Sequence, residues 1–160
     1  MEQQNFKPQV REFDSVVYDP RFLAAAGTSA DGIIFALNIV PLEEASTSPE
    51  AQLYQSWLKK SFGSAKPDYF GVYAWSAARM FQQALEQVGP QLTRAKLISN
   101  LQNLHSWDDH GMHAAQDVGG KKPTPCFLFM TVANGAFKRL YPSSGFDCTR
   151  APDYAVKSAG

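Results

Sequence analysis

The stretch Gly32-Ile33-Ile34-Phe35-Ala36-Leu37-Asn38-Ile39-Val40, which runs into Pro41, decides how the rest of the chain is interpreted. It is almost wholly apolar, rich in β-branched residues and too short for a typical helix. Continuous apolar runs of this length are typical of strands that are covered on both faces. The sequence therefore predicts a buried strand over residues 32–40.

Helix signals dominate the chain after this strand. Ser48 followed by Pro49 is a favourable helix start, because serine caps free N–H groups and proline fits the first helical position. A second helix is predicted from Asp68 to Val88, and a third begins at Thr93. Helical spacing predicts buried apolar stripes on the second and third helices, formed by Tyr73, Ala77, Phe81, Ala84, Leu85 and Val88 and by Leu97, Ile98, Leu101 and Leu104.

The two cysteines of the chain flank a predicted hairpin. Asn134-Gly135 separates two strand-like runs, and a type I′ turn needs positive φ at both of its central residues. The hairpin and the turn after Pro142 can bring Cys148 back toward Cys126, so we expect a disulfide of the kind found in secreted proteins. Two unpaired thiols remain the alternative, since spacing does not fix geometry.

The remaining segments complete an alternating α/β pattern. Residues 9–18 predict a short strand, and residues 22–27 predict a helical turn that is closed by glycine. Residues 105–125 are polar and rich in glycine and proline, which predicts a loop. Residues 149–160 predict a loose tail.

Size and composition narrow the possible functions. The chain has 160 residues, 44% of them hydrophobic, and a formal net charge of zero. This charge balance argues against nucleic acid or an anionic membrane surface as the main partner. No apolar run approaches the ~20 residues of a membrane span. The first residues, Met1 to Asn5, have no basic region followed by an apolar stretch, so we expect no signal peptide in this chain.

Five short motifs follow one another in a specific order. They are Ala30-Asp31-Gly32-Ile33-Ile34, Pro67 to Ala78 with its aromatic residues, Gln83 to Gly89, Asp109-His110-Gly111 and Asn134-Gly135-Ala136-Phe137-Lys138-Arg139. Together they resemble the type I periplasmic binding proteins of the leucine/isoleucine/valine-binding class, over about residues 1–148. In that family such segments occupy the second half of a chain more than twice as long.

The resemblance implies a periplasmic binding protein type I-like fold, with two Rossmann-like lobes on a hinge, of which this chain is an incomplete carboxy-terminal portion. Residues 1–31 would belong to lobe 2, and residues 32–122 would form a hinge strand and the helices of lobe 1. Residues 123–148 would return through the hinge and build the lobe 2 hairpin. Strand edges without partners predict marginal stability in isolation, or association with another copy.

The resemblance also implies a function without covalent chemistry or a cofactor. It predicts an extracytoplasmic protein, periplasmic or at the cell surface, that captures a small polar solute for uptake by an ABC permease. The expected solute is a branched-chain amino acid or a related compound. The alternatives are a sensory ligand-binding domain of the same fold and a metal-dependent hydrolase.

The resemblance suggests four ligand-binding residues. Asp19 would bind the ammonium group of the ligand and Tyr18 would pack on it, although the family pattern at this loop matches only loosely. Asp19 before Pro20 is equally typical of a turn start. Tyr69 and Tyr73 would line an aromatic wall of the cleft, or they would pack in the core.

Residue types that bind metals gather in one stretch of the sequence: His105, His110, His113, Asp108 and Asp109. Their spacing fits no standard zinc motif, and they lie in a predicted loop, so we expect a solvated loop and no metal. The sequence carries no Gly-x-Ser-x-Gly, phosphate-binding loop or Cys-x-x-Cys motif.

Overall fold

The structure is a computed structural model that describes residue 6 and residues 8–149. Its centre is a four-stranded sheet in the order β1-β2-β3-β4. The strands are β1 (Arg11–Phe13), β2 (Ile33–Leu37), β3 (Leu128–Ala133) and β4 (Ala136–Tyr141). β1 pairs with β2 in parallel, and the other two pairings are antiparallel. The predicted tail lies outside the described residues apart from Thr149.

β2 forms the predicted strand but is buried differently from the expectation. Ile33, Phe35 and Leu37 are buried, whereas the two residues between them are only partly covered. One face therefore carries the core, as is typical of antiparallel sheets. Ile39 lies beyond the strand and makes an isolated bridge with His113.

The predicted helices form at the predicted starts. α2 (Pro49–Phe62), α3 (Tyr69–Val88) and α4 (Arg94–Gln102) follow capping residues Ser48, Asp68 and Thr93. Each cap side chain accepts a hydrogen bond from a backbone N–H of the first turn, which would otherwise be unpaired. A shorter helix, α1 (Pro20–Ala26), and the 3₁₀ turns η2 (Ser15–Val17), η3 (Gly27–Ala30), η4 (Leu42–Thr47) and η5 (Gly89–Gln91) complete the set.

The predicted strand over residues 9–18 is wrong for most of its length. Only residues 11–13 pair with β2, and the η2 turn follows. The Asp14 side chain accepts a hydrogen bond from the backbone N–H of Val16 at 3.0 Å. Such local bonds compete with strand pairing and favour a turn.

The hairpin and the disulfide are both confirmed. Asn134 and Gly135 have φ angles of 55° and 70° between β3 and β4, as the turn chemistry predicts. Cys126 is bonded to Cys148 across a sequence separation of 22.

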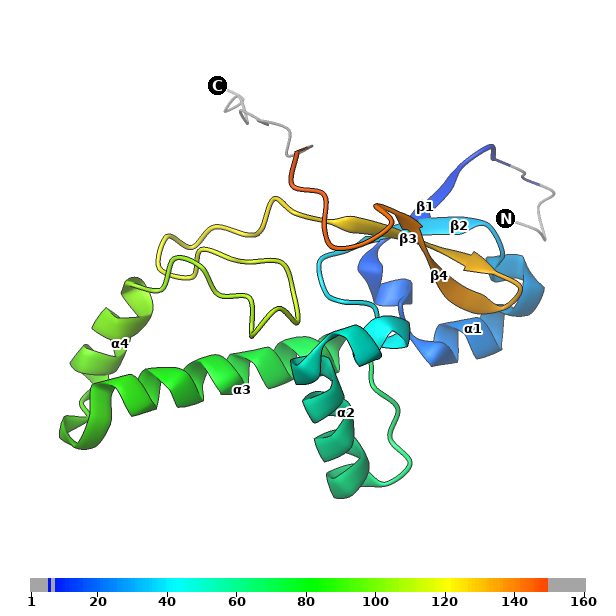
Figure 1. Cartoon of the computed structure of the whole chain (residues 1–160). Coiled ribbons are helices and arrows are strands. Elements are labelled where there is room, and N and C mark those ends of the chain that lie inside the picture. Colours follow the sequence, from blue (N-terminus) through cyan, green and yellow to red (C-terminus); the bar gives the residue numbers. More distant parts are fainter. Residues whose placement is uncertain (1–5, 7, 150–160) are drawn as a thin grey trace.

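The described residues divide into two regions that Figure 1 shows side by side. The sheet region comprises residues 11–37 and 126–149, and the helical arm comprises residues 49–125. α3 leads away from the sheet to α4, and the loop of residues 103–127 returns along it. The short segment of residues 38–48, with η4, connects the two regions.

The predicted apolar stripes of the arm are not buried as expected. Phe81 on α3 and Ile98 on α4 are exposed, and α4 buries none of its side chains among the described residues. α3 buries Ala84 as predicted, and its other buried residues are Val72 and Ser76, which lie outside the predicted stripe. None of the helices in the described part of the chain is both long and apolar enough for a membrane span.

Candidate functional site

Two adjacent cavities open where the sheet region meets the helical arm. One has a volume of about 200 Å³ and is lined by Tyr18, Pro20, Leu42, Glu43, Gln55, Lys66, Pro67 and Phe137. The other, of about 340 Å³, is lined by Asp19, Pro20, Arg21, Ser64, Lys66 and Asp68. Because the cavities share Pro20 and Lys66, we treat them together as the junction groove.

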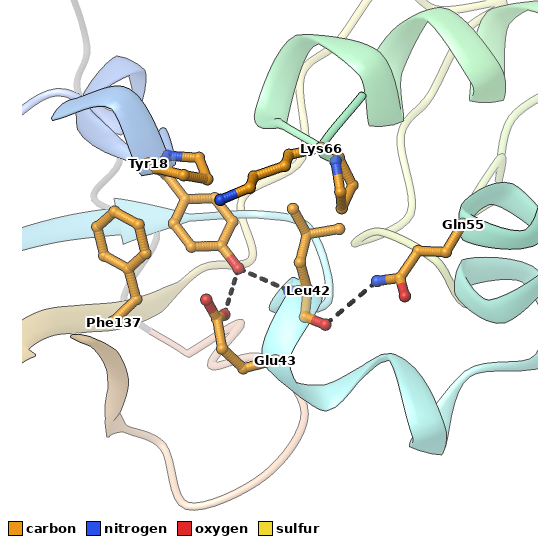
Figure 2. Close-up of a pocket in the computed structure, with 8 residues that line it drawn as sticks. Tyr18, Leu42, Glu43, Gln55, Lys66 and Phe137 are labelled. Atoms are coloured by element: carbon orange, nitrogen blue, oxygen red, sulfur yellow. Dashed lines mark hydrogen bonds between the residues drawn. The ribbon is translucent and has the colours of Figure 1, made fainter. Parts of the chain in front are cut away.

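Tyr18 forms the inner wall of the groove (Figure 2). Its side chain is buried, and its ring lies edge-on to Phe137 with centroids 4.8 Å apart. Its hydroxyl donates to Glu43 Oε2 at 2.5 Å and accepts from the backbone N–H of Leu42 at 2.6 Å. Burial, together with the Glu43 carboxylate, raises the pKa of Tyr18, so the hydroxyl stays protonated. Tyr18 thus joins the sheet region to the connecting segment.

The opposite wall carries an amide and a cation. Gln55 on α2 donates to the carbonyl of Leu42 at 3.3 Å. Lys66 lies in the loop before α3, and Figure 2 shows its side chain beside Tyr18 at the cavity. Its ammonium is exposed and has no hydrogen bond or ion pair within the part of the chain that the structure describes. It can therefore receive an anionic group.

Asp19 lines the second cavity and also caps α1. Its carboxylate accepts from the backbone N–H of Arg21 at 2.7 Å and pairs with the Arg21 guanidinium. The hydrogen bonds from Arg21 hold the pKa of Asp19 below its usual value. The Arg21 side chain is 85% exposed. An ion pair this exposed contributes little, so another cation can replace the guanidinium at small cost.

A second contact links the sheet region to the connecting segment. Arg139 on β4 makes a bidentate pair with Glu44 on η4, with distances of 2.8 and 2.6 Å. Glu43 and Glu44 are consecutive, and both bind groups from the sheet region. The connecting segment is therefore attached to the sheet by two charge-assisted contacts.

The structure places Tyr69 and Tyr73 against the end of β2 and not among the residues that line the groove. Their hydroxyls lie 3.4 and 2.6 Å from Asn38 Oδ1, and their rings meet edge to face at 5.2 Å. Tyr73 also stacks on His113. Both tyrosines thus pack between α3 and the neighbouring segments, and a ligand contact through them stays a prediction.

The histidines that were weighed as a metal site are held by separate partners. His105 pairs with Asp117 at 2.7 Å. His113 is buried, with its Nε2 atom 2.8 Å from Ser76 Oγ. His110 is exposed and lies near Trp107. The three rings do not meet at one point, so the histidines form no joint site. The expectation of a solvated loop is wrong for Asp109 and His113, which are buried.

Two of the four residues predicted from the sequence, Tyr18 and Asp19, line the junction groove, but the prediction did not include the residues that face them. Glu43, Gln55, Lys66 and Phe137 come from four different segments. No sequence motif marks these four residues as binding residues, because turn-rich charged stretches and amphipathic helices occur in proteins of many functions. Only the path of the chain brings them together.

Comparison with known proteins identifies what the chain is similar to. A family profile described as "Periplasmic binding protein" matches residues 1–136. No curated protein matches the chain.

Solved structures share the fold at low sequence identity. A leucine binding protein LivK from Thermotoga maritima has a TM-score of 0.66 at 16% identity, over 88% of this chain and 38% of that one. A fatty acid ABC transporter substrate-binding protein from Thermomonospora curvata has 0.73 at 18%, over 94% and 39%. A branched chain amino acid ABC transporter from Thermus thermophilus with bound valine has 0.70 at 11%, over 94% and 42%. The chain thus spans about two fifths of the length of these proteins.

Proposed function

The chain belongs to the periplasmic binding protein family, and from that premise we propose that it is the carboxy-terminal share of an extracytoplasmic solute-binding protein. The complete protein would deliver a small molecule to an ABC permease. The partial span of its structural relatives supports this assignment. The chain's own task would be to provide one part of the ligand cleft.

The observation that carries the proposal is the position of the junction groove between two regions. Tyr18 and Phe137 come from the sheet region, whereas Gln55 and Lys66 come from the helical arm. A molecule in the groove would touch both regions and favour the arrangement in which they close on it. Ligand-driven closure of this kind depends only on the difference in affinity between the open and closed states.

The lining of the groove suits a small zwitterion with an apolar side chain. Lys66 offers a free ammonium for a carboxylate, and Asp19 offers a carboxylate that an incoming ammonium can share with Arg21. Tyr18 and Phe137 supply an apolar wall. The smaller cavity, at about 200 Å³, lies below the range of about 300–1,000 Å³ that drug-sized ligands occupy. We therefore propose a branched-chain amino acid as the ligand.

A fatty acid is the second candidate, because a relative of similar fold is a fatty acid transport protein. A fatty acid carboxylate could also reach Lys66. It would leave Asp19 without a partner other than Arg21, and its tail would need a longer apolar channel than the cavity provides. The two candidates therefore differ in their dependence on Asp19.

Calorimetric titration of the chain with L-leucine, L-valine and a medium-chain fatty acid tests the proposal. We expect the amino acids to bind and Lys66→Gln to weaken them by about tenfold, the effect of losing one charge-assisted hydrogen bond. Lys138→Gln is the matched control, because Lys138 is exposed on β4 outside the groove.

Asp19→Asn separates the two candidates. It should weaken the amino acids and leave a fatty acid unaffected. Equal affinity of the wild type and Lys66→Gln for leucine, or tighter binding of the fatty acid, would contradict the assignment.

A further inference from the structure

A second group of polar side chains gathers away from the junction groove, where α2 begins beside the loop of residues 103–127. Glu50 lies in the first turn of α2, and Asp109 and His110 are neighbours in the loop. One ligand-type atom from each residue lies within 4.8 Å of the others. None of the three lines the groove.

Asp109 is the unexpected member of this cluster. It is 0% exposed, and neither of its carboxylate oxygens has a hydrogen-bond partner among the described residues. Buried carboxylates are nearly always paired or bound to a metal, because an unpaired buried charge is costly. The Asp109 carboxylate therefore lacks the direct hydrogen-bonding partner that a buried carboxylate usually has.

Glu50 is already oriented by two side chains of α3. Its Oε1 atom accepts from Trp75 Nε1 at 2.7 Å and from Arg79 Nε at 2.8 Å. Its Oε2 atom has only one contact, with Arg79 Nη2 at 3.3 Å. A carboxylate has about four lone-pair positions, so Oε2 can still bind a cation. Trp75 and Arg79 would act as the outer partners that hold a ligand carboxylate in place.

The loop that carries Asp109 is fixed to α3 by a buried polar network. Trp107 Nε1 donates to Ser76 Oγ at 2.8 Å, and the Ser76 hydroxyl donates to His113 Nε2 at 2.8 Å. His113 Nδ1 then donates to the carbonyl of Ala114 at 2.9 Å. These bonds hold the loop on both sides of Asp109, so the carboxylate is positioned before any ligand arrives.

His110 completes the cluster on its open side. The ring is exposed, whereas Glu50 and Asp109 are buried, so an ion could enter past the imidazole. Imidazole ligands favour zinc and other first-row transition metals over calcium and magnesium, which prefer sets of oxygen ligands. Three protein ligands with an open position are a common zinc arrangement. We propose that Glu50, Asp109 and His110 bind a divalent first-row transition-metal ion such as Zn²⁺.

The charges of the site favour a cation. Glu50 and Asp109 supply two negative charges, of which Arg79 balances one. A bound Zn²⁺ would bind the Asp109 carboxylate directly and would link the start of α2 to the loop. The inference is independent of the solute in the junction groove and needs no chemical reaction.

Titration of the whole chain with ZnCl₂, followed by calorimetry, tests this site. We expect one zinc ion per chain, with at least about tenfold weaker binding in His110→Gln and in Asp109→Asn. His105→Gln is the matched control, because His105 is an exposed histidine of the same loop that pairs with Asp117. It should keep the wild-type affinity. CaCl₂ and MgCl₂ should bind more weakly than ZnCl₂.

The variants keep the proposal open to refutation even if one of them is unstable. His110 is exposed, so its replacement should not disturb folding, which circular dichroism would check. Zinc affinity in His110→Gln equal to that of the wild type, an equal loss in His105→Gln, no zinc binding by the folded chain, or a preference for calcium would each overturn the site.

Discussion

The sheet region buries one face of β2 and of β3, whereas the helical arm leaves much of its apolar surface exposed. Phe35 in β2 is 0% exposed and packs edge-on to Phe137. Phe81 in α3 is 49% exposed. The arm adds Ala51, Tyr54, Val72 and Met112 to the apolar core, and it is also held by polar contacts around Ser76 and between Glu50 and Arg79. The two adjacent parts of the chain thus rely on apolar and polar contacts in different proportions.

This difference shows that an apolar stripe in the sequence of a helix does not by itself mean that the stripe is buried in the folded chain. Apolar burial is non-directional and grows with the area removed from water, so it stabilises the sheet region wherever its side chains meet. A hydrogen-bond network depends on every member, because a buried polar group left without a partner is costly. The stability of the arm should therefore fall when a single polar member of the network is replaced. The stability of the sheet region should fall when a buried apolar side chain is shortened.

The largest expected effect separates two phenylalanines. Phe35→Ala should lower the free energy of unfolding by about 3–5 kcal/mol, because it leaves a cavity in the core. Phe81→Ala, at an exposed position, should lower it by less than about 1 kcal/mol. Urea unfolding of both variants measures this contrast. Equal losses would show that the arm has a core comparable with that of the sheet region.

The next effect concerns the disulfide, which lies only in the sheet region. Replacing Cys126 and Cys148 together by alanine should lower the free energy of unfolding by about 3 kcal/mol, since the bond restricts a loop of 22 residues in the unfolded chain. Wild-type protein under reducing conditions is the control and should match the variant. Unchanged stability in both would mean that the hairpin is fixed by its strand pairing alone.

A smaller effect is expected from Ser76→Ala, which acts only on the arm. The variant leaves the indole N–H of Trp107 and the ring nitrogen of His113 unpaired, and should cost about 1–3 kcal/mol. Hydrogen exchange at the backbone N–H of Ala114, which donates to Asn38, would report local opening. Ser56→Ala is the control, because its hydroxyl bonds an exposed helix carbonyl. Faster exchange of the Ala114 N–H in Ser56→Ala but not in Ser76→Ala would contradict the proposed role of the hydrogen-bond network.

The smallest expected effect is a pH dependence that resides in the arm. Burial lowers the pKa of His113 from 6.5, while the Ala114 carbonyl and Asp108 oppose this shift more weakly. As the pH falls, the unfolded chain therefore binds the proton at a higher pH than the folded chain does. The stability that neutral His113 contributes should be fully present above pH 6.5 and should decline as the pH falls below that value. Unfolding measured between pH 5 and 8 should show this slope, and His113→Gln should flatten it. A slope unchanged in that variant would assign it to another group.

Local chemistry in the sequence predicted much of the framework. Ser48, Asp68 and Thr93 marked the helix starts, and Asn134-Gly135 marked the hairpin, because caps and tight turns are decided by a few adjacent residues. The short turn at Asp14 was missed, since its hydrogen bond to Val16 competes with a strand pattern that looks equally good in sequence.

Long-range placement could not be predicted in the same way. Lys66 faces Tyr18, and Glu50 lies beside Asp109, only because the chain folds back on itself. The spacing of these residues along the sequence does not indicate that they lie close together in the folded chain. The exposure of Phe81 was missed for a related reason, because helical periodicity shows which face is apolar but not what covers it.

The pairing of β2 with β3 has a consequence for the order in which the chain assembles. Thr131 Oγ1 donates to the carbonyl of Ile33, 98 positions earlier in the sequence. The segments that form α2, α3 and α4 are synthesised before β3. These helices can therefore form while β2 is not yet paired with β3. Closing so long a loop is entropically costly and slow. The central strands should therefore join last, and until then the unpaired backbone edge of β2 is open to chaperones or to another nascent chain.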